Sequence, residues 1–106
     1  MPQPVVLTSS EEEAVQRLGR RIKAARLRRN ITQEAMASRA GVTRKTYADL
    51  EAGKPTVGLS ILVKTMMILG YLDRVGDLLA ADPIGEDAEA ESGRKRASSR
   101  SGIGDF

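Results

Sequence analysis

Apolar residues recur at helical spacing through the first eighty positions of the chain, and this spacing is lost after Pro83. Leu18, Ile22 and Ala25, for example, lie three or four positions apart and share one face of a predicted helix. The pattern predicts an all-α fold of five helices, over residues 10–29, 33–40, 44–52, 59–69 and 73–80.

Capping residues and glycines support these boundaries. Ser10 and Glu13 have the spacing of a capping box at the start of the first helix. Thr32 and Thr43 are placed to cap the second and third helices. Gly41 suits the left-handed conformation that ends a helix. The sequence therefore predicts a very short turn between the second and third helices.

The chain is 106 residues long, which is enough for one compact domain. We expect a flexible leader over residues 1–9, a helical domain over residues 10–82 and a disordered charged tail over residues 83–106. Gly, Ser, Ala and charged residues dominate the tail, and such a composition buries too little apolar surface to offset chain entropy. At most a helical turn is expected there, within residues 86–91.

Composition excludes several kinds of chemistry. The sequence contains no Cys and no His, which removes disulfides, thiolate ligands, imidazole general bases and most zinc sites. We therefore expect no cofactor, no metal and no catalytic activity. No apolar run approaches the roughly 18 residues of a membrane span, so no membrane partner is expected either.

Charge is segregated along the chain. Residues 17–54 contain eleven basic and three acidic residues, a net charge of +8, whereas residues 73–91 carry a net charge of −6. A basic domain favours a polyphosphate partner because each neutralised phosphate releases counterions. Basic helices are also often only solvated surfaces, so the charge is compatible with DNA binding without establishing it.

The spacing of small and apolar residues within residues 33–50 is typical of a helix-turn-helix. Ala37 is small where two helices must approach closely, and Gly41 follows four positions later, in the turn. Val42, Tyr47 and Leu50 then supply apolar contacts between the two helices. The second helix of this motif enters the major groove, so double-stranded DNA is the expected partner.

A helical wheel of residues 44–52 separates an inner side from an outer side. Tyr47 and Leu50 fall on the inner side, which favours core packing for Tyr47 over contact with nucleic acid. The outer side carries Lys45, Ala48 and Asp49, with Arg44 flanking it, and these four are the candidate base-reading residues.

Each of these outer residues suits a particular contact. Arg44 and Lys45 both match guanine O6 and N7, with a phosphate contact as the alternative for Lys45. Ala48 is small enough to permit close approach or to touch a thymine methyl group. Asp49 either accepts a hydrogen bond from cytosine N4 or pairs with Lys45 one turn away, and the wheel leaves both alternatives open.

Three segments resemble the phage-repressor-type helix-turn-helix family, also called XRE or Cro-like, namely TQEAMA (32–37), GVTRKTY (41–47) and LEAGK (50–54). The resemblance covers about residues 18–79. It implies that Gln33 contacts a phosphate and supports the recognition helix. It also implies an internal ion pair between Arg26 and Glu51.

The same resemblance implies the positions that face DNA. Thr43, Arg44, Lys45 and Asp49 would occupy the groove, and Lys54 and Thr56 would form a second phosphate clamp. For Lys54 and Thr56 the alternative is an ordinary solvated loop.

Modules of this type commonly bind DNA as two-fold dimers. The fourth predicted helix is apolar on two faces, of which Leu59, Leu62, Met66 and Leu69 suit the domain core. The second face must be covered either by the fifth helix or by a partner copy. For a homodimer, the expected interface residues are Ile61, Ile68, Leu72, Val75 and Leu79.

Residues 56–59 and 69–73, followed by a basic tail, are similar to HipB-type antitoxins. That resemblance implies a protein that represses its own operon and binds a kinase-like (HipA-like) toxin. The acidic run at residues 82–91 and the lack of a strand pattern depart from it. The leading hypothesis is a cytoplasmic, nucleoid-associated repressor; the alternative is a protein-interaction adaptor that has this fold but reads no bases.

Overall fold

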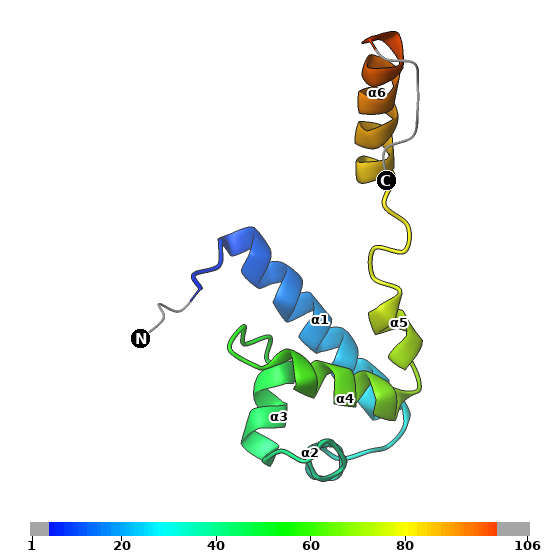
Figure 1. The fold of residues 1–106 in the computed structure, drawn as a ribbon. Coiled ribbons are helices and arrows are strands. Elements are labelled where there is room, and N and C mark those ends of the chain that lie inside the picture. The colour runs from blue at the N-terminus through cyan, green and yellow to red at the C-terminus, as the bar shows by residue number, and fades with distance from the viewer. Residues whose placement is uncertain (1–4, 100–106) are drawn as a thin grey trace. The chain divides into compact units, whose positions relative to one another are not determined.

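The computed structural model describes the backbone of residues 5–99 and the side chains of residues 5–93. Every element within the described residues is helical (Figure 1). The chain divides after Gly76 into two compact units. The first unit contains α1 (Ser9–Arg28), α2 (Gln33–Ala40), α3 (Arg44–Glu51), α4 (Leu59–Leu69) and α5 (Leu72–Gly76), and the second contains α6 (Pro83–Ser99).

The start of α1 corrects one sequence expectation. The capping box is formed by Thr8 and Glu11 and not by Ser10 and Glu13: the Thr8 N–H donates to Glu11 Oε1 at 2.9 Å, and the Glu11 N–H donates to Thr8 Oγ1 at 3.2 Å. Three successive hydroxyl residues each have a glutamate three positions later, so spacing alone does not choose among them.

The predicted limits of α2 and α3 are confirmed to within one residue. Thr32 Oγ1 accepts from the Ala35 N–H at 3.0 Å, and Thr43 Oγ1 accepts from the Thr46 N–H at 3.1 Å. Gly41 ends α2 with φ 74°, a left-handed conformation that glycine adopts without strain. The two helices are therefore separated by residues 41–43 alone.

The core lies where α1, α2, α3 and α4 meet, and six buried side chains form it: Ile22, Met36, Ala37, Tyr47, Leu50 and Leu69. Tyr47 is fully buried, as the helical wheel predicted. Ala37 is also buried, on the helix α2 that packs against α3.

The core face of α4 differs in part from the expected one. Leu69 is in the core and Leu62 packs against it, as expected. Leu59 was also expected in the core but is 71% exposed, whereas Thr65 is completely buried. Ile61 and Ile68 are half-buried and pack against the core, although we expected them on a second face. Apolar residues lie on more than one face of α4, so its periodicity does not identify the inner stripe, and the face that contains Leu59 was favoured over the one that contains Thr65.

The chain after α4 also differs from expectation. Helix α5 ends at Gly76 and does not continue to residues 79–80, where Leu79 has a left-handed backbone (φ 66°). Residues Pro83–Ser99 form α6 where we expected disorder from residue 83, so the described chain has six helices and not five. The expectation for residues 100–106 lies outside the described residues.

Local signals account for α6. The Asp82 side chain accepts from the Gly85 N–H at 2.9 Å, and Pro83 occupies the first turn, where its missing N–H is not needed. Nearly all side chains from residue 83 to 93 are exposed, so the helix has no apolar stripe by which amphipathic periodicity could identify it. No helix within residues 5–99 is both long enough and apolar enough to cross a bilayer.

Helix α1 approaches the end of α3 at backbone distance through two glycines. A Cβ added to Gly19 would lie 2.8 Å from the Leu50 carbonyl oxygen and still closer to that of Glu51. Gly53 has φ 74°, and a Cβ there would lie 2.9 Å from the Gln16 backbone nitrogen. This close packing sets the position of the end of α3 relative to α1.

We expect Gly19→Ala to destabilise the protein by about 1–3 kcal/mol, because the added methyl group meets backbone atoms that cannot rotate away. Urea denaturation measures the change in the free energy of unfolding. Gly76→Ala is the matched control, because its Cβ would meet no atom within 4 Å, and it should leave stability unchanged or slightly raised. Equal stability of the two variants would contradict the close approach of α1 to α3.

Candidate nucleic-acid interface

The turn between α2 and α3 is held by backbone hydrogen bonds. The Val42 N–H donates to the Ala37 carbonyl at 3.0 Å, and the Gly41 N–H donates to the Ser38 carbonyl at 3.2 Å. These bonds satisfy carbonyls at the end of α2 that would otherwise lack a partner. The arrangement is the predicted helix-turn-helix, with α3 as its second helix.

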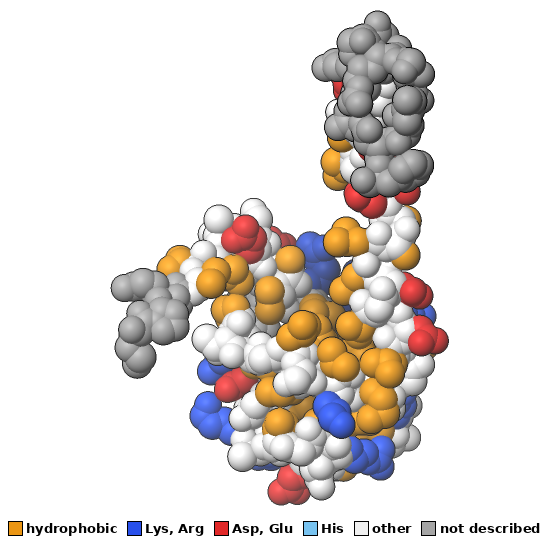
Figure 2. All heavy atoms as spheres, in the orientation of Figure 1, with side chains coloured by type: hydrophobic (Ala, Val, Ile, Leu, Met, Phe, Trp, Pro, Cys, Tyr) orange, Lys and Arg blue, Asp and Glu red, His pale blue; other side chains and the backbone are white. Residues whose placement is uncertain are grey.

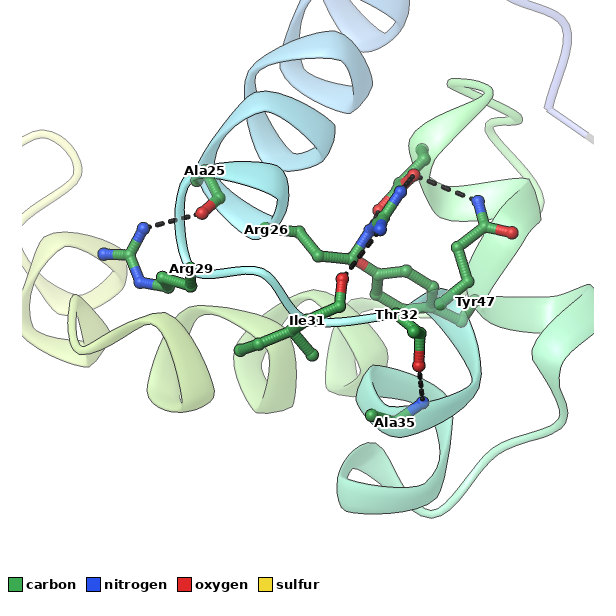
Figure 3. Close-up of polar contacts among 9 residues, drawn as sticks. Ala25, Arg26, Arg29, Ile31, Thr32, Ala35 and Tyr47 are labelled. Atoms are coloured by element: carbon green, nitrogen blue, oxygen red, sulfur yellow. Dashed lines mark hydrogen bonds and ion pairs between the residues drawn. The ribbon is translucent and has the colours of Figure 1, made fainter.

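The inner side of α3 is fixed by one buried carboxylate, that of Glu51. Arg26 from α1 binds both of its oxygens, through Nε to Oε2 at 2.6 Å and Nη2 to Oε1 at 3.0 Å. The Tyr47 hydroxyl donates to Oε2 at 2.6 Å, and Gln33 Nε2 from α2 donates to Oε1 at 3.1 Å. Figure 3 shows Arg26 and Tyr47 converging on this carboxylate from different helices. We call these four residues the Glu51 cluster.

The ion pair that the family resemblance implied between Arg26 and Glu51 is confirmed. Arg26 also donates through Nη1 to the Ile31 carbonyl at 2.8 Å, so it holds the connection between α1 and α2 as well (Figure 3). Its guanidinium is buried, so Arg26 is a structural residue and is withdrawn from the surface charge.

Proton equilibria in the Glu51 cluster favour the ion pair. Burial by itself would raise the pKa of the Glu51 carboxyl, but hydrogen bonds from Arg26, Tyr47 and Gln33 outweigh it, and the net pKa lies below its ordinary value. The hydrogen bond to Glu51 raises the pKa of Arg26. Burial and the same carboxylate raise the pKa of Tyr47, so the phenol stays protonated and remains a donor.

The first turn of α3 presents one unpaired cation. Arg44 is exposed, and within the described residues its guanidinium makes no hydrogen bond or ion pair. Thr43, also exposed, uses its hydroxyl locally, accepting from the Thr46 N–H and donating to Thr46 Oγ1 at 3.0 Å. Ala48 is half-buried on the same helix.

The two candidate lysines are both paired with Asp49. Lys45 Nζ lies 3.3 Å from Asp49 Oδ2, and Lys54 Nζ lies 3.4 Å from Asp49 Oδ1. The pairing of Asp49 with Lys45, one of the two predicted alternatives, is thus present. Desolvation would raise the pKa of the Asp49 carboxyl, but the two lysines outweigh it and lower the pKa.

An open hollow adjoins the start of α3 and is lined by residues of three helices, including Lys23, Gln33 and Arg44. Gln33 is half-buried and donates one amide hydrogen to Glu51, which leaves the other available. Lys23 had not been predicted as a site residue, although its position three residues before Arg26 places the two side chains on one face of α1. Lys54 and Thr56 are exposed in the loop after α3.

The basic residues of α1 do not form a single surface. Arg21, Arg28 and Arg29 line a separate groove between α1 and α4, together with Tyr71 and Arg74. There Arg29 donates to the carbonyls of Ala25 (2.8 Å) and Leu69 (3.0 Å). The guanidinium carbon of Arg74 lies 3.8 Å from the centroid of the Tyr71 ring. The charge of +8 over residues 17–54 therefore overstates the charge at α3.

The predicted dimer residues lie in three different environments. Ile61 and Ile68, on α4, pack against the core. Leu72 and Val75 lie on α5, where Leu72 is 47% exposed and Val75 is half-buried. Leu79 is exposed and lies in the second unit. Figure 2 shows hydrophobic side chains gathered over α4 and α5 on the viewed face.

Within the described residues, no group of three acidic, His or Cys side chains is placed to hold a metal ion.

The Glu51 cluster should make stability depend on pH. Because the folded state lowers the pKa of Glu51, its contribution is present above the unfolded value of 4.5 and is lost as pH falls through the lower folded value. We expect Glu51→Gln to cost about 3–5 kcal/mol near neutral pH, since Arg26 loses its buried counter-charge. The variant should also lose part of the acid dependence of the wild type.

Urea denaturation at neutral pH and at about pH 3.5 tests this expectation. Glu34→Gln, which removes an exposed carboxylate of α2, is the control and should change stability by no more than about 0.5 kcal/mol. An unchanged acid dependence in Glu51→Gln would show that the cluster does not control it.

Comparison with known proteins agrees with this geometry. No curated protein matches the chain significantly. Residues 22–71 match the family model described as helix-turn-helix, and this segment contains α2, the turn, α3 and the whole Glu51 cluster. The chain therefore carries, over residues 22–71, a helix-turn-helix domain of the phage-repressor-like (XRE-type) family of DNA-binding transcription regulators.

Proposed function

We propose that this protein is a sequence-specific transcriptional repressor that binds a palindromic operator as a homodimer, with α3 in the major groove. The observation that carries the proposal is the contrast between the two sides of α3. Its inner side is fixed by the Glu51 cluster, and its outer side presents the unpaired guanidinium of Arg44. Rigid presentation of a donor fork is what base recognition requires.

Several residues on and beside the outer side of α3 have a role in this docking. Arg44 donates to O6 and N7 of a guanine, and Ala48 lets α3 approach the base edges or contacts a thymine methyl group. Gln33 donates its second amide hydrogen to a phosphate, at the helix N-terminus where anions are favoured. Lys54 and Thr56 contact a phosphate on the other side of α3, and Lys23 adds charge beside Gln33.

The dimer is proposed from the exposed apolar surface of α4 and α5. Leu59, Met67 and Leu72 are large apolar side chains that the first unit leaves exposed, and a partner copy would cover them. Leu72 and Val75 remain the proposed interface centre; Ile61 and Ile68 contribute less, because the core already covers part of each. Leu79 belongs to the second unit, and its place in the interface stays a prediction.

Repression follows from occupancy of an operator, and regulation of its own operon is part of the proposal. The role as an antitoxin to a kinase-like toxin stays a prediction from the resemblance, because no contact among the described residues bears on a toxin. The alternative function is an adaptor that binds other proteins and reads no bases. The adaptor and the repressor differ in a single measurable property, namely discrimination between DNA sequences.

We expect Arg44→Ala to weaken binding to the preferred duplex by about 1–3 kcal/mol, or roughly 5- to 150-fold, and to relax specificity at one base pair of each half-site. Binding to a random-sequence duplex should change much less. The preferred duplex is obtained by selection from a random pool with the wild-type protein, and affinities are measured by fluorescence anisotropy at fixed salt. Arg28→Ala, which removes an arginine of the α1–α4 groove, is the matched control.

The selected sequence itself tests the dimer. We expect two inverted half-sites whose centres lie about one helical turn apart. Failure of the wild type to select any sequence, even at low salt, would favour the adaptor. An equal loss for Arg44→Ala on selected and random duplexes would reduce Arg44 to a phosphate contact.

A further inference from the structure

One carboxylate on the outer side of α3 holds two lysines. Asp49 directs Oδ2 to Lys45, one turn earlier on the same helix, and Oδ1 to Lys54, in the loop that follows. The Asp49 side chain is 25% exposed, whereas the Lys45 and Lys54 side chains are 82% and 57% exposed. Both ammonium groups are therefore accessible to DNA, and both have a counter-charge already.

These pairs change which cations a DNA duplex meets at α3. A lysine ammonium is a hydrated point charge that attracts any phosphate, whereas the arginine guanidinium matches the guanine edge in a fixed geometry. On α3 and in the loop that follows it, both lysines are paired and Arg44 is not. On this part of the surface, the groups that bind DNA without regard to sequence are thus the restrained ones.

We propose that Asp49 is a specificity-determining residue, which lowers the affinity for random sequence by holding Lys45 and Lys54 and by repelling phosphates that approach α3. The proposal rests on the proposed function, because it concerns discrimination by the same DNA-binding surface. A phosphate that recruits either lysine brings a negative charge near the Asp49 carboxylate and removes one of its two partners. That cost arises on every sequence.

A suitable operator offsets this cost. A cytosine in the groove donates its N4 amino group to the Asp49 carboxylate and replaces the lysines as its partner. Lys45 and Lys54 are then released to phosphates or to a guanine edge. Only a sequence with a donor at that position gains both the base contact and the two cations, so Asp49 penalises incorrect sites more than correct ones.

The test uses the full chain and the variant Asp49→Asn, which keeps the shape of the side chain and removes its charge. On a random-sequence duplex we expect affinity to rise about tenfold or more. The slope of log affinity against log salt should steepen by up to about 2 units, because each added phosphate contact contributes about 0.9. Affinity for the selected duplex should stay constant or fall, so the ratio of selected to random affinity decreases.

Asp73→Asn is the matched control, because it makes the same change in net charge at an exposed carboxylate of α5. A second control repeats Asp49→Asn in the background Lys45→Met/Lys54→Met, where no lysine remains to be released and the gain in random affinity should disappear. The carboxylates of Asp49 and Asp73 are accessible and make at most surface ion pairs. Because such pairs contribute little to stability, we expect the variants to fold.

The proposal is overturned if Asp73→Asn raises random affinity as much as Asp49→Asn does, since the effect is then one of net charge. It is equally overturned if the gain persists without the lysines, or if Asp49→Asn leaves the ratio of selected to random affinity unchanged. Failure of the proposed function is a separate result: a wild-type protein that selects no sequence from the pool removes the repressor, whatever Asp49→Asn does to the salt slope.

Discussion

The buried carboxylate of Glu51 is the interaction on which the position of α3 depends. It accepts hydrogen bonds from α1 through Arg26, from α2 through Gln33 and from within α3 through Tyr47. A buried charge is tolerated only when its hydrogen-bonding capacity is satisfied, and here three helices must be in place together for that to happen. The orientation of α3 is thus coupled to the folding of the whole unit, and Gly19 permits the close backbone contact between α1 and the end of α3.

Sequence patterns predicted the features that local physical chemistry determines. The caps at Thr32 and Thr43 follow from a hydroxyl placed before a helix, and the turn at Gly41 follows from the need for a left-handed residue. The Arg26–Glu51 pair came from family resemblance, because no local rule links residues 25 positions apart. Apolar periodicity did not identify the buried face of α4, because apolar residues lie on more than one face of that helix. It also did not predict α6, because that helix has no apolar stripe.

Counting charges along the chain was a poorer guide than locating them. Among the basic residues of 17–54, Arg26 is in a buried pair, Arg21, Arg28 and Arg29 line the groove between α1 and α4, and the surface around α3 includes Lys23 and Arg44. At α3 itself Asp49 neutralises part of what remains. A surface with few free cations obtains a larger share of its binding energy from base contacts, and a modest local charge is therefore compatible with selective recognition of DNA.

We propose that the outer side of α3, held by the Glu51 cluster, is the surface that meets DNA. Amide chemical shifts of the full chain, followed by NMR while the selected duplex is titrated, test this proposal. We expect the largest changes at residues 43–49, at Gln33 and at residues 54–56. Changes concentrated instead on Arg21, Arg28, Arg29 and Arg74 of the α1–α4 groove, with residues 43–49 unaffected, would contradict it.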